Sequence, residues 1–566
     1  MRNRFTFQGA AWAISLCLTL SFLFTATVQA QELKPFLTLK VADPATLMSV
    51  AEKIADLTGQ RRDFDAGVAS FKDLKGLNRK GPFGLVLQTD GEEIKNPLFV
   101  LPIEKLEDVD LPNFEALMAS AKKEGDGKYV INSPVGQYNM YQRKDHLLVT
   151  GADSEGELPG DVQKLFAGLD DYTLGLRIDL ENTSRDSIDM LLAPVTLLLA
   201  MQGGQAAQSA ESMSEAIETL YNECRSMTIG ITFDAKTAAA EIVASTIPKK
   251  GSDSEKQLIG FKDAKTAFSG FLGSGSNVVF SVGGVDSNTK ATKDTTMATI
   301  DQVIDGLLEQ AEDQAETDED FEFAENVAES IRTIIEATLD KGKSDLACSL
   351  DGNGTFLLAT TIGDTDELKK LAKACFEHFK KMHDAEEADN VAEKYFKKEY
   401  KTVEGFVLSS FVLPLVDTND PKIPSTLADK TISVYWGLKE NDAIAVAFGF
   451  DPVETEKCFI EALNKTETPV AVRQPTAIFA FQPLGKLLDQ YVPKETKDST
   501  MEKVVDLLSA ATSDAKITYS IKVDGEVLEG KLSASGSAVQ VLMNLYRIFT
   551  AADSAGTIDS TKIREF

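Results

Sequence analysis

The sequence predicts an α+β protein of two similar halves, each a flat or curved antiparallel sheet covered by helices and built from repeated β-hairpin–helix units. Short runs of alternating apolar and polar residues are joined in pairs by tight turns, such as Asp90-Gly91 and Asp524-Gly525. Most pairs precede an amphipathic helix pattern that opens with a capping residue. The same order of elements also occurs twice along the chain. Because tight turns join antiparallel strands, we expect antiparallel sheets with helices on their faces.

The first thirty residues, 1–30, have the pattern of a secretory signal peptide. Arg2 and Arg4 precede an apolar run, and Val28-Gln29-Ala30 supplies the small residues of a cleavage site. We expect cleavage after Ala30 and export to the periplasm or the extracellular space. Beyond this point the longest apolar stretch, Met190 to Met201, is too short to span a bilayer. The mature chain should therefore be soluble, with no transmembrane segment.

Residues 31–272 are expected to form the first half. In order, it contains a strand–helix pattern, a hairpin, a weaker hairpin, a second strand–helix pattern and a hairpin–helix unit, at 35–57, 83–102, 140–151, 172–201 and 227–261. Pro112 fits the first position of a helix after the first hairpin. Ser252 and Glu255 have capping-box spacing at the start of the last helix.

Residues 273–549 are expected to form the second half, after a glycine-rich linker at Gly273 to Asn277. It contains a strand–helix pattern, two hairpin–helix units, a further strand–helix pattern and a final hairpin–helix unit, at 277–310, 346–382, 432–464, 477–510 and 519–549. The halves share element order and turn chemistry, with little residue identity, which indicates an internal duplication. We expect the acidic stretch Glu309 to Ser330 to be a solvated connection between two helices, and the tail, 550–566, to be disordered.

The stretch from Ser349 to Cys375 begins like a calcium loop, with Asp351, Asn353 and Thr355 on alternate positions. An EF-hand loop needs a bidentate Glu at its twelfth position, which is Ile362 here. The pattern therefore favours a hairpin turn over a metal site. Asp364, three residues before Glu367, is placed to cap the helix that follows.

Charge and cysteine content exclude several kinds of partner and site. The net charge of −30 includes Arg2 and Arg4, so cleavage leaves −32, and a field of this sign repels nucleic acid and anionic membranes. The four cysteines that remain after cleavage are far apart and form no CxxC motif. If the helix that begins after Asp364 packs back on the hairpin formed around the Asp351–Gly354 turn, Cys348 and Cys375 are the pair that could form a disulfide after export.

The sequence offers little catalytic machinery. Its three histidines are His146, expected to be exposed at a hairpin, and His378 and His383, which are five residues apart on a helix and poorly spaced for a metal. No nucleophile elbow, P-loop or dinucleotide fingerprint stands at a strand-to-helix junction. Trp436 alternates within a strand pattern and is expected in the core. We therefore expect no catalytic residue, no metal and no cofactor.

The signal peptide, the acidic mature chain and phrases such as "FGLVLQTDGEEIKNPLFVLPIEKLEDV" resemble uncharacterised secreted proteins of planctomycete-type bacteria. The resemblance implies an exported location and a repeated α+β build, and it implies no activity.

These observations favour an exported, soluble, acidic and non-catalytic binding or envelope-associated protein, whose partner is a protein or an apolar ligand. One alternative is a carrier of apolar small molecules or lipids, in which the helix at Met190 to Met201 closes a curved sheet. A second alternative is a hydrolase that uses a pair of carboxylates, because a chain so rich in acids brings some of them close together.

Overall fold

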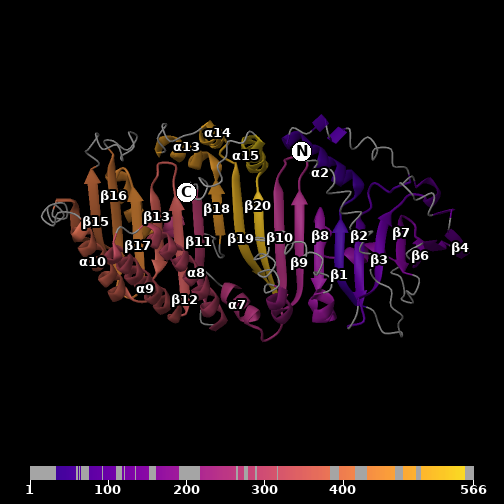
Figure 1. The fold of residues 1–566 in the computed structure, drawn as a ribbon, viewed down its shortest axis with the longest axis horizontal. Coiled ribbons are helices and arrows are strands. Elements are labelled where there is room, and N and C mark those ends of the chain that lie inside the picture. The colour runs from indigo at the N-terminus through magenta and orange to yellow at the C-terminus, as the bar shows by residue number, and fades with distance from the viewer. Residues whose placement is uncertain are drawn as a thin grey trace. The chain divides into compact units, whose positions relative to one another are not determined.

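The computed structural model describes residues 34–58, 61–62, 64–65, 76–91, 94–109, 118–119, 121–125, 127–133, 136–151, 161–189, 217–262, 266–272, 278–286, 290–314, 317–382, 394–414, 430–465, 476–491 and 499–554. The chain divides into two compact units: unit 1 comprises Met1–Ser252 and Glu526–Met543, and unit 2 comprises Asp253–Gly525 and Asn544–Phe566. Each contains an antiparallel sheet with helices (Figure 1), which confirms the predicted α+β class. The expected signal peptide, the linker 273–277 and the apolar stretch Met190 to Met201 lie outside the described residues.

Unit 1 contains the strands β1 (Lys34–Val41), β2 (Phe83–Thr89), β3 (Ile94–Pro102), β4 (Ala121–Gly125), β5 (Lys128–Ser133), β6 (Gly136–Gln142), β7 (His146–Gly151), β8 (Leu174–Asp179), β9 (Cys224–Phe233), β10 (Ala240–Pro248) and β20 (Val527–Ala534). Their order across the sheet is β4-β5-β6-β7-β3-β2-β1-β8-β9-β10-β20, and each neighbouring pair is antiparallel. The helical elements include α2 (Pro44–Thr58), the short 3-10 helices η2 (Leu106–Asp108), η3 (Val162–Phe166) and η4 (Leu180–Asn182), and helical segments at 185–189 and 217–223. Helix α15 (Gly536–Ser554) begins in unit 1 and ends in unit 2.

Unit 2 contains the strands β11 (Val278–Asp286), β12 (Lys343–Leu350), β13 (Phe356–Thr361), β14 (Phe396–Val403), β15 (Phe406–Pro414), β16 (Thr431–Lys439), β17 (Ala443–Gly449), β18 (Thr476–Ala480) and β19 (Lys516–Asp524). They lie in the order β14-β15-β16-β17-β13-β12-β11-β18-β19, again antiparallel throughout. Its helices are α7 (Asp253–Lys262), η5 (Ser269–Leu272), α8 (Lys290–Gln314), α9 (Asp318–Asp340), α10 (Thr365–Met382), α12 (Pro452–Asn464), α13 (Phe481–Tyr491) and α14 (Ser499–Ser509).

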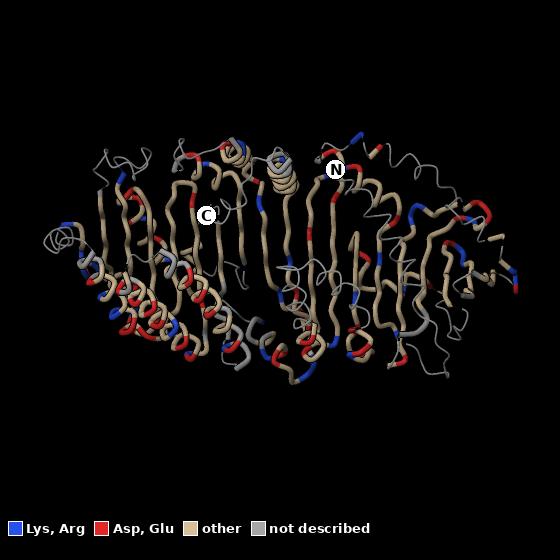
Figure 2. The backbone as a smooth tube through the Cα atoms, in the orientation of Figure 1, with Lys and Arg blue, Asp and Glu red and all other residues tan. Residues whose placement is uncertain are grey.

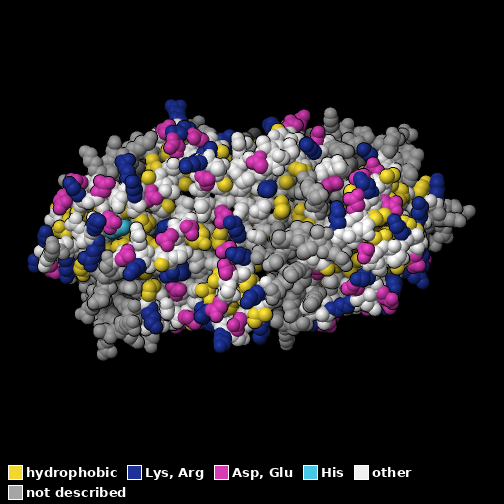
Figure 3. All heavy atoms as spheres, turned by 180° about the vertical axis from the view of Figure 1, so that it is seen from behind, with side chains coloured by type: hydrophobic (Ala, Val, Ile, Leu, Met, Phe, Trp, Pro, Cys, Tyr) yellow, Lys and Arg dark blue, Asp and Glu magenta, His cyan; other side chains and the backbone are white. Residues whose placement is uncertain are grey.

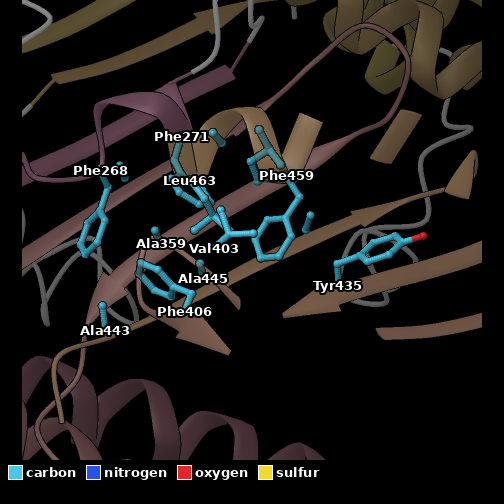
Figure 4. Packing of buried hydrophobic residues seen from close by; sticks show 14 of the residues in the cluster. Phe268, Phe271, Ala359, Val403, Phe406, Tyr435, Ala443, Ala445, Phe459 and Leu463 are labelled. Carbon is cyan, nitrogen blue, oxygen red and sulfur yellow. The ribbon is translucent and has the colours of Figure 1, made fainter. Parts of the chain in front are cut away.

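The largest described core lies in unit 2, where η5 and α12 pack on one face of the sheet (Figure 4). Phe271 and Phe459 meet edge to face with their ring centroids 6.2 Å apart. The sheet beneath them presents small side chains, including the fully buried Ala445 and Ala447. Small residues on the strands therefore make room for the aromatic rings of the covering helices.

Turns and caps at the predicted positions explain why these strands and helices begin and end where they do. Asp351 Oδ1 accepts from the backbone N–H groups of Asn353 (2.8 Å) and Thr355 (2.9 Å). The aspartate at the start of the Asp351–Gly354 turn therefore stabilises that turn. Asp364 Oδ1 accepts from two N–H groups of the first turn of α10. Asp451 caps α12 in the same way, with Pro452 at the first helical position. These predictions are confirmed.

The acidic stretch from Glu309 to Ser330 differs from the prediction. Most of it is helical, because α8 runs to Gln314 and α9 begins at Asp318. Arg332 of α9 donates to Asp301 at 2.8 Å and Asp305 at 2.9 Å, both on α8, and so relieves part of the repulsion between these acidic helices. Charged residues gather on the helices and at strand ends, whereas the strands are largely uncharged (Figure 2).

Candidate functional site

The two cysteines expected to form a disulfide are free thiols in the structure. Cys348 is half-buried in β12, and Cys375 is exposed on α10. Burial raises the pKa of the Cys348 thiol, which keeps it protonated and unreactive near neutral pH. Their pairing stays a prediction. Within the described ranges, no three His, Cys, Asp or Glu side chains are grouped so that they could hold a metal ion.

His146 is not exposed, contrary to the prediction from its hairpin position. Only 3% of the residue is accessible, because β7 pairs with both β3 and β6 and so lies inside the sheet. Its Nδ1 lies 2.8 Å from Asp145 Oδ1, while Nε2 is buried and has no hydrogen-bond partner. Because a carboxylate oxygen accepts hydrogen bonds, Nδ1 is the ring nitrogen placed to donate to Asp145. His378 stacks on Phe323 with ring centroids 3.9 Å apart, and His383 lies outside the described residues.

A polar pocket of about 330 Å³ lies in unit 1, where β1 leads into α2. Its lining includes Lys40, Asp43, Lys80, Phe166 and Asp170. Phe166 packs over Gly84, where any larger residue would clash, since a Cβ there would lie 2.1 Å from the ring. No sequence pattern indicates this pocket, because its lining comes from three separate segments of the chain, 40–46, 80–82 and 163–173.

The side chain buried at this pocket, Lys40, is fully engaged with the backbone. Its Nζ donates to the carbonyl oxygens of Leu169 (2.9 Å), Asp170 (2.7 Å) and Tyr172 (3.1 Å). Burial lowers the pKa of Lys40, and the charges of nearby aspartates oppose this effect. Since an ammonium group has three N–H donors and all three are used, Lys40 fixes the 169–172 turn and has no donor left for a ligand.

The aspartate beside this lysine also has a structural role. Asp43 accepts from the Thr46 backbone N–H at 2.9 Å and from its hydroxyl at 2.8 Å, and it therefore caps α2. A carboxylate held in this way is a poor general acid or base. The pocket is thus lined by polar groups, but two of its charged side chains, Lys40 and Asp43, form hydrogen bonds that stabilise the fold.

A second feature of unit 1 is a line of apolar side chains across four adjacent strands. Leu174 of β8 is opposite Ile231 of β9, which is opposite Ile242 of β10, which in turn is opposite Leu532 of β20. Directly opposed residues in an antiparallel sheet point to the same face. We call these four residues the apolar row. The line continues into the sheet through the half-buried Val41 and Phe83.

The apolar row is exposed although its residues are all large and aliphatic. Leu174 is 39% accessible, Ile231 37%, Ile242 42% and Leu532 41%. The opposite face of the same strands is polar, with Arg177, Thr228, Ser245 and Glu529 opposed in the same manner. A half-buried antiparallel sheet usually turns its polar face to water and its apolar face to the core. Here the apolar face is covered only in part: Leu176 and Ile178, on the same face of β8, pack against a core cluster, whereas the four residues of the row stay exposed. Exposed apolar side chains that lie next to one another mark a candidate binding surface.

Unit 2 has a longer line of the same kind. It runs across seven strands through Trp436, Val446, Leu358, Cys348, Phe280, Ala477 and Tyr519. Phe280 and Tyr519 are exposed, and the other members are half-buried. Trp436 was expected in the core, but it lies on this partly exposed face. Its ring stacks on that of Phe396, with the ring centroids 5.6 Å apart. The alternation of apolar and polar residues along these strands predicts that each strand has an apolar face, but it does not predict that this face is exposed.

Comparison with known proteins gives no independent indication of function: no protein-family model, curated protein or solved structure matches the chain. Among the helices that the structure describes, none is both long and apolar enough to cross a bilayer.

Proposed function

We propose that this protein is an exported, non-catalytic binding protein that uses the exposed apolar row of unit 1 to hold a partner. The apolar row of unit 1 is the observation that carries this proposal. Four large aliphatic side chains in register on one face, with a polar opposite face, make a surface that gains free energy when it is covered. Export follows from the signal peptide pattern of residues 1–30.

The polar pocket supports a catalytic role less well. Of its charged groups, Lys40 donates to backbone carbonyl groups and Asp43 caps the start of α2. A carboxylate-based hydrolase needs one acid kept protonated beside one kept ionised. The exposed Asp170 and Asp171 share one solvated environment, which does not separate their roles.

An internal duplication also fits the strand topology. Eight pairings in unit 1 join β1–β2, β2–β3, β3–β7, β6–β7, β5–β6, β4–β5, β1–β8 and β8–β9. Eight pairings in unit 2 repeat them when ten is added to each strand number. We infer that residues 31–272 and 273–549 descend from one ancestral set of strands. An experimental structure in which the corresponding strands fail to superpose would refute this inference.

The binding face can be tested with an unspecific apolar dye, N-phenylnaphthylamine, whose fluorescence rises in apolar surroundings. Leu532→Lys places a charge in the apolar row, whereas Ser533→Lys places the same charge on the opposite face of β20. We expect the first change to weaken dye binding about tenfold, since burying a leucine side chain contributes about 1.5–3 kcal/mol, and the second to leave it within about twofold. Equal dye binding by the two variants would show that the row is not the binding surface.

A further inference from the structure

We propose that β4 and β14 are protected edge strands, whose lysines and irregular backbone prevent each sheet from pairing with another chain. Among the described strands, β4 pairs only with β5, and β14 pairs only with β15. An edge strand presents a row of unpaired backbone N–H and C=O groups, to which a strand of another molecule can add. The proposal concerns self-association and is independent of the apolar row.

Both edge strands contain the same three residues in the same order, Lys-Lys-Glu. These are Lys122, Lys123 and Glu124 in β4, and Lys397, Lys398 and Glu399 in β14. All six are exposed. Consecutive residues of a strand point to opposite faces of the sheet, so two adjacent lysines place a positive charge on each face. Pairing of two such edges would bring like charges opposite each other, which is destabilising.

The backbone of β4 is also irregular at its glutamate. The register of β4 against β5 shifts between Lys123 and Gly125. Glu124, which lies between them, is an extra residue with none opposite it, and it therefore forms a β-bulge. A bulge bends the strand and increases its twist, so a straight strand from another molecule cannot form a regular ladder along this edge.

The backbone of β14 is irregular at the corresponding place. Its register against β15 shifts between Lys397 and Lys401. Within this stretch Glu399 has a positive φ of 47°, and its N–H donates to the hydroxyl of Ser409 on β15 at 3.0 Å. A left-handed residue interrupts the extended backbone of a strand. The N–H group of Glu399 is thus used inside the sheet and is not offered to another chain.

The strand behind the β14 edge explains why protection is needed there. β15 has the sequence FVLSSFVLP, nine residues without a charge. Segments with high β-propensity and low charge are the ones that stack into intermolecular sheets. Because β14 pairs with β15 on its outer side, a charged and bent strand forms the boundary of the sheet in place of an apolar one.

The test opens one edge at a time in the full mature chain. Lys122→Thr with Lys123→Thr opens the β4 edge, and Lys397→Thr with Lys398→Thr opens the β14 edge. Threonine removes the charge and favours strands. Deletion of Glu124 is a further variant, which restores a regular register in β4 while keeping its lysines.

A matched control removes the same charge from strands that are paired on both sides. Lys34→Thr with Lys439→Thr changes exposed lysines of β1 and β16, whose backbone groups already have neighbours on either side. Circular dichroism spectra and melting curves check that every variant is folded. Sedimentation velocity over a range of protein concentrations measures association.

We expect each variant with one opened edge to sediment with twice the mass of the unchanged protein, because two identical edges form a closed pair. A chain with both edges opened should form assemblies that lengthen with concentration, since each copy then has two pairing edges. Deletion of Glu124 in addition to Lys122→Thr and Lys123→Thr should lower the dissociation constant of the pair about tenfold. Hydrogen exchange should show new protection of backbone amides in the opened strand.

Three outcomes would overturn the proposal. One is that the folded edge variants sediment like the control at every concentration. Another is that the control associates as strongly as the edge variants, because loss of charge alone would then be the cause. The third is association without new protection of amides in β4 or β14, which would place the contact on another surface.

Discussion

At the scale of single residues, Lys40 is a buried charged side chain whose hydrogen bonds stabilise the fold. Its ammonium group joins β1 to carbonyl groups about 130 residues away in sequence. A buried charge is tolerated when all its hydrogen-bond donors are satisfied. The three carbonyl oxygens do this, and Lys40 therefore shapes the wall of the polar pocket instead of serving a ligand.

Replacing Lys40 tests this role. Lys40→Met keeps the length of the side chain but leaves three carbonyl groups without their donor, so we expect the free energy of unfolding to fall by about 2–4 kcal/mol. Lys80→Met, at the exposed lysine of the same pocket, should change it by less than about 0.5 kcal/mol. Urea denaturation followed by circular dichroism measures both. A loss of stability that is equal in the two variants would contradict the structural role of Lys40.

The surroundings of a residue could be predicted from the sequence where its contacts are local, and not where they are distant along the chain. The hairpin aspartate Asp351 and the helix cap Asp364 act on backbone groups within four residues of themselves, so local patterns were enough to place them. His146 was expected to be exposed because it follows a turn. Its burial depends on pairing with β3, a strand about 45 residues earlier in the chain, and no local pattern encodes that contact.

At the scale of elements, the repeated unit of hairpin and capped helix was predicted well. The unit at β16, β17 and α12 contains each expected part, including Asp451, whose carboxylate accepts from the backbone N–H groups of Val453 and Glu454. The acidic stretch between α8 and α9 was predicted less well. Most of its acids lie on the two helices, which Arg332 joins, whereas the density of like charge predicted a solvated connection between them.

The cap of α12 provides a test at this scale. Asp451→Ala removes the acceptor for two N–H groups, and we expect it to lower the free energy of unfolding by about 1 kcal/mol. Asp451→Asn retains an oxygen acceptor at the same place and should cost less. Thermal unfolding of the three proteins under the same buffer conditions ranks them. If Asn is as destabilising as Ala, the oxygen of residue 451 is not what stabilises the start of α12.

At the scale of the whole molecule, each of the two units contains antiparallel strands whose two faces differ in character. Over the face drawn in Figure 3, charged side chains of both signs are interspersed with hydrophobic ones, while the register places apolar residues in line on one face of the strands β8, β9, β10 and β20. Sequence alternation predicts that a strand has an apolar face. Whether that face is covered depends on strand order, which local patterns do not contain. For this reason the fold class was predictable, and the apolar row was not.

The most direct test of the binding face is photo-cross-linking with an apolar diazirine probe, followed by peptide mass spectrometry of the labelled full-length protein. The account predicts that labels concentrate on peptides that contain Ile231, Ile242 and Leu532, and that Leu532→Lys removes them while Ser533→Lys does not. Labels that are spread evenly over the protein, or that concentrate on the exposed Val303 and Leu307 of α8, would contradict it.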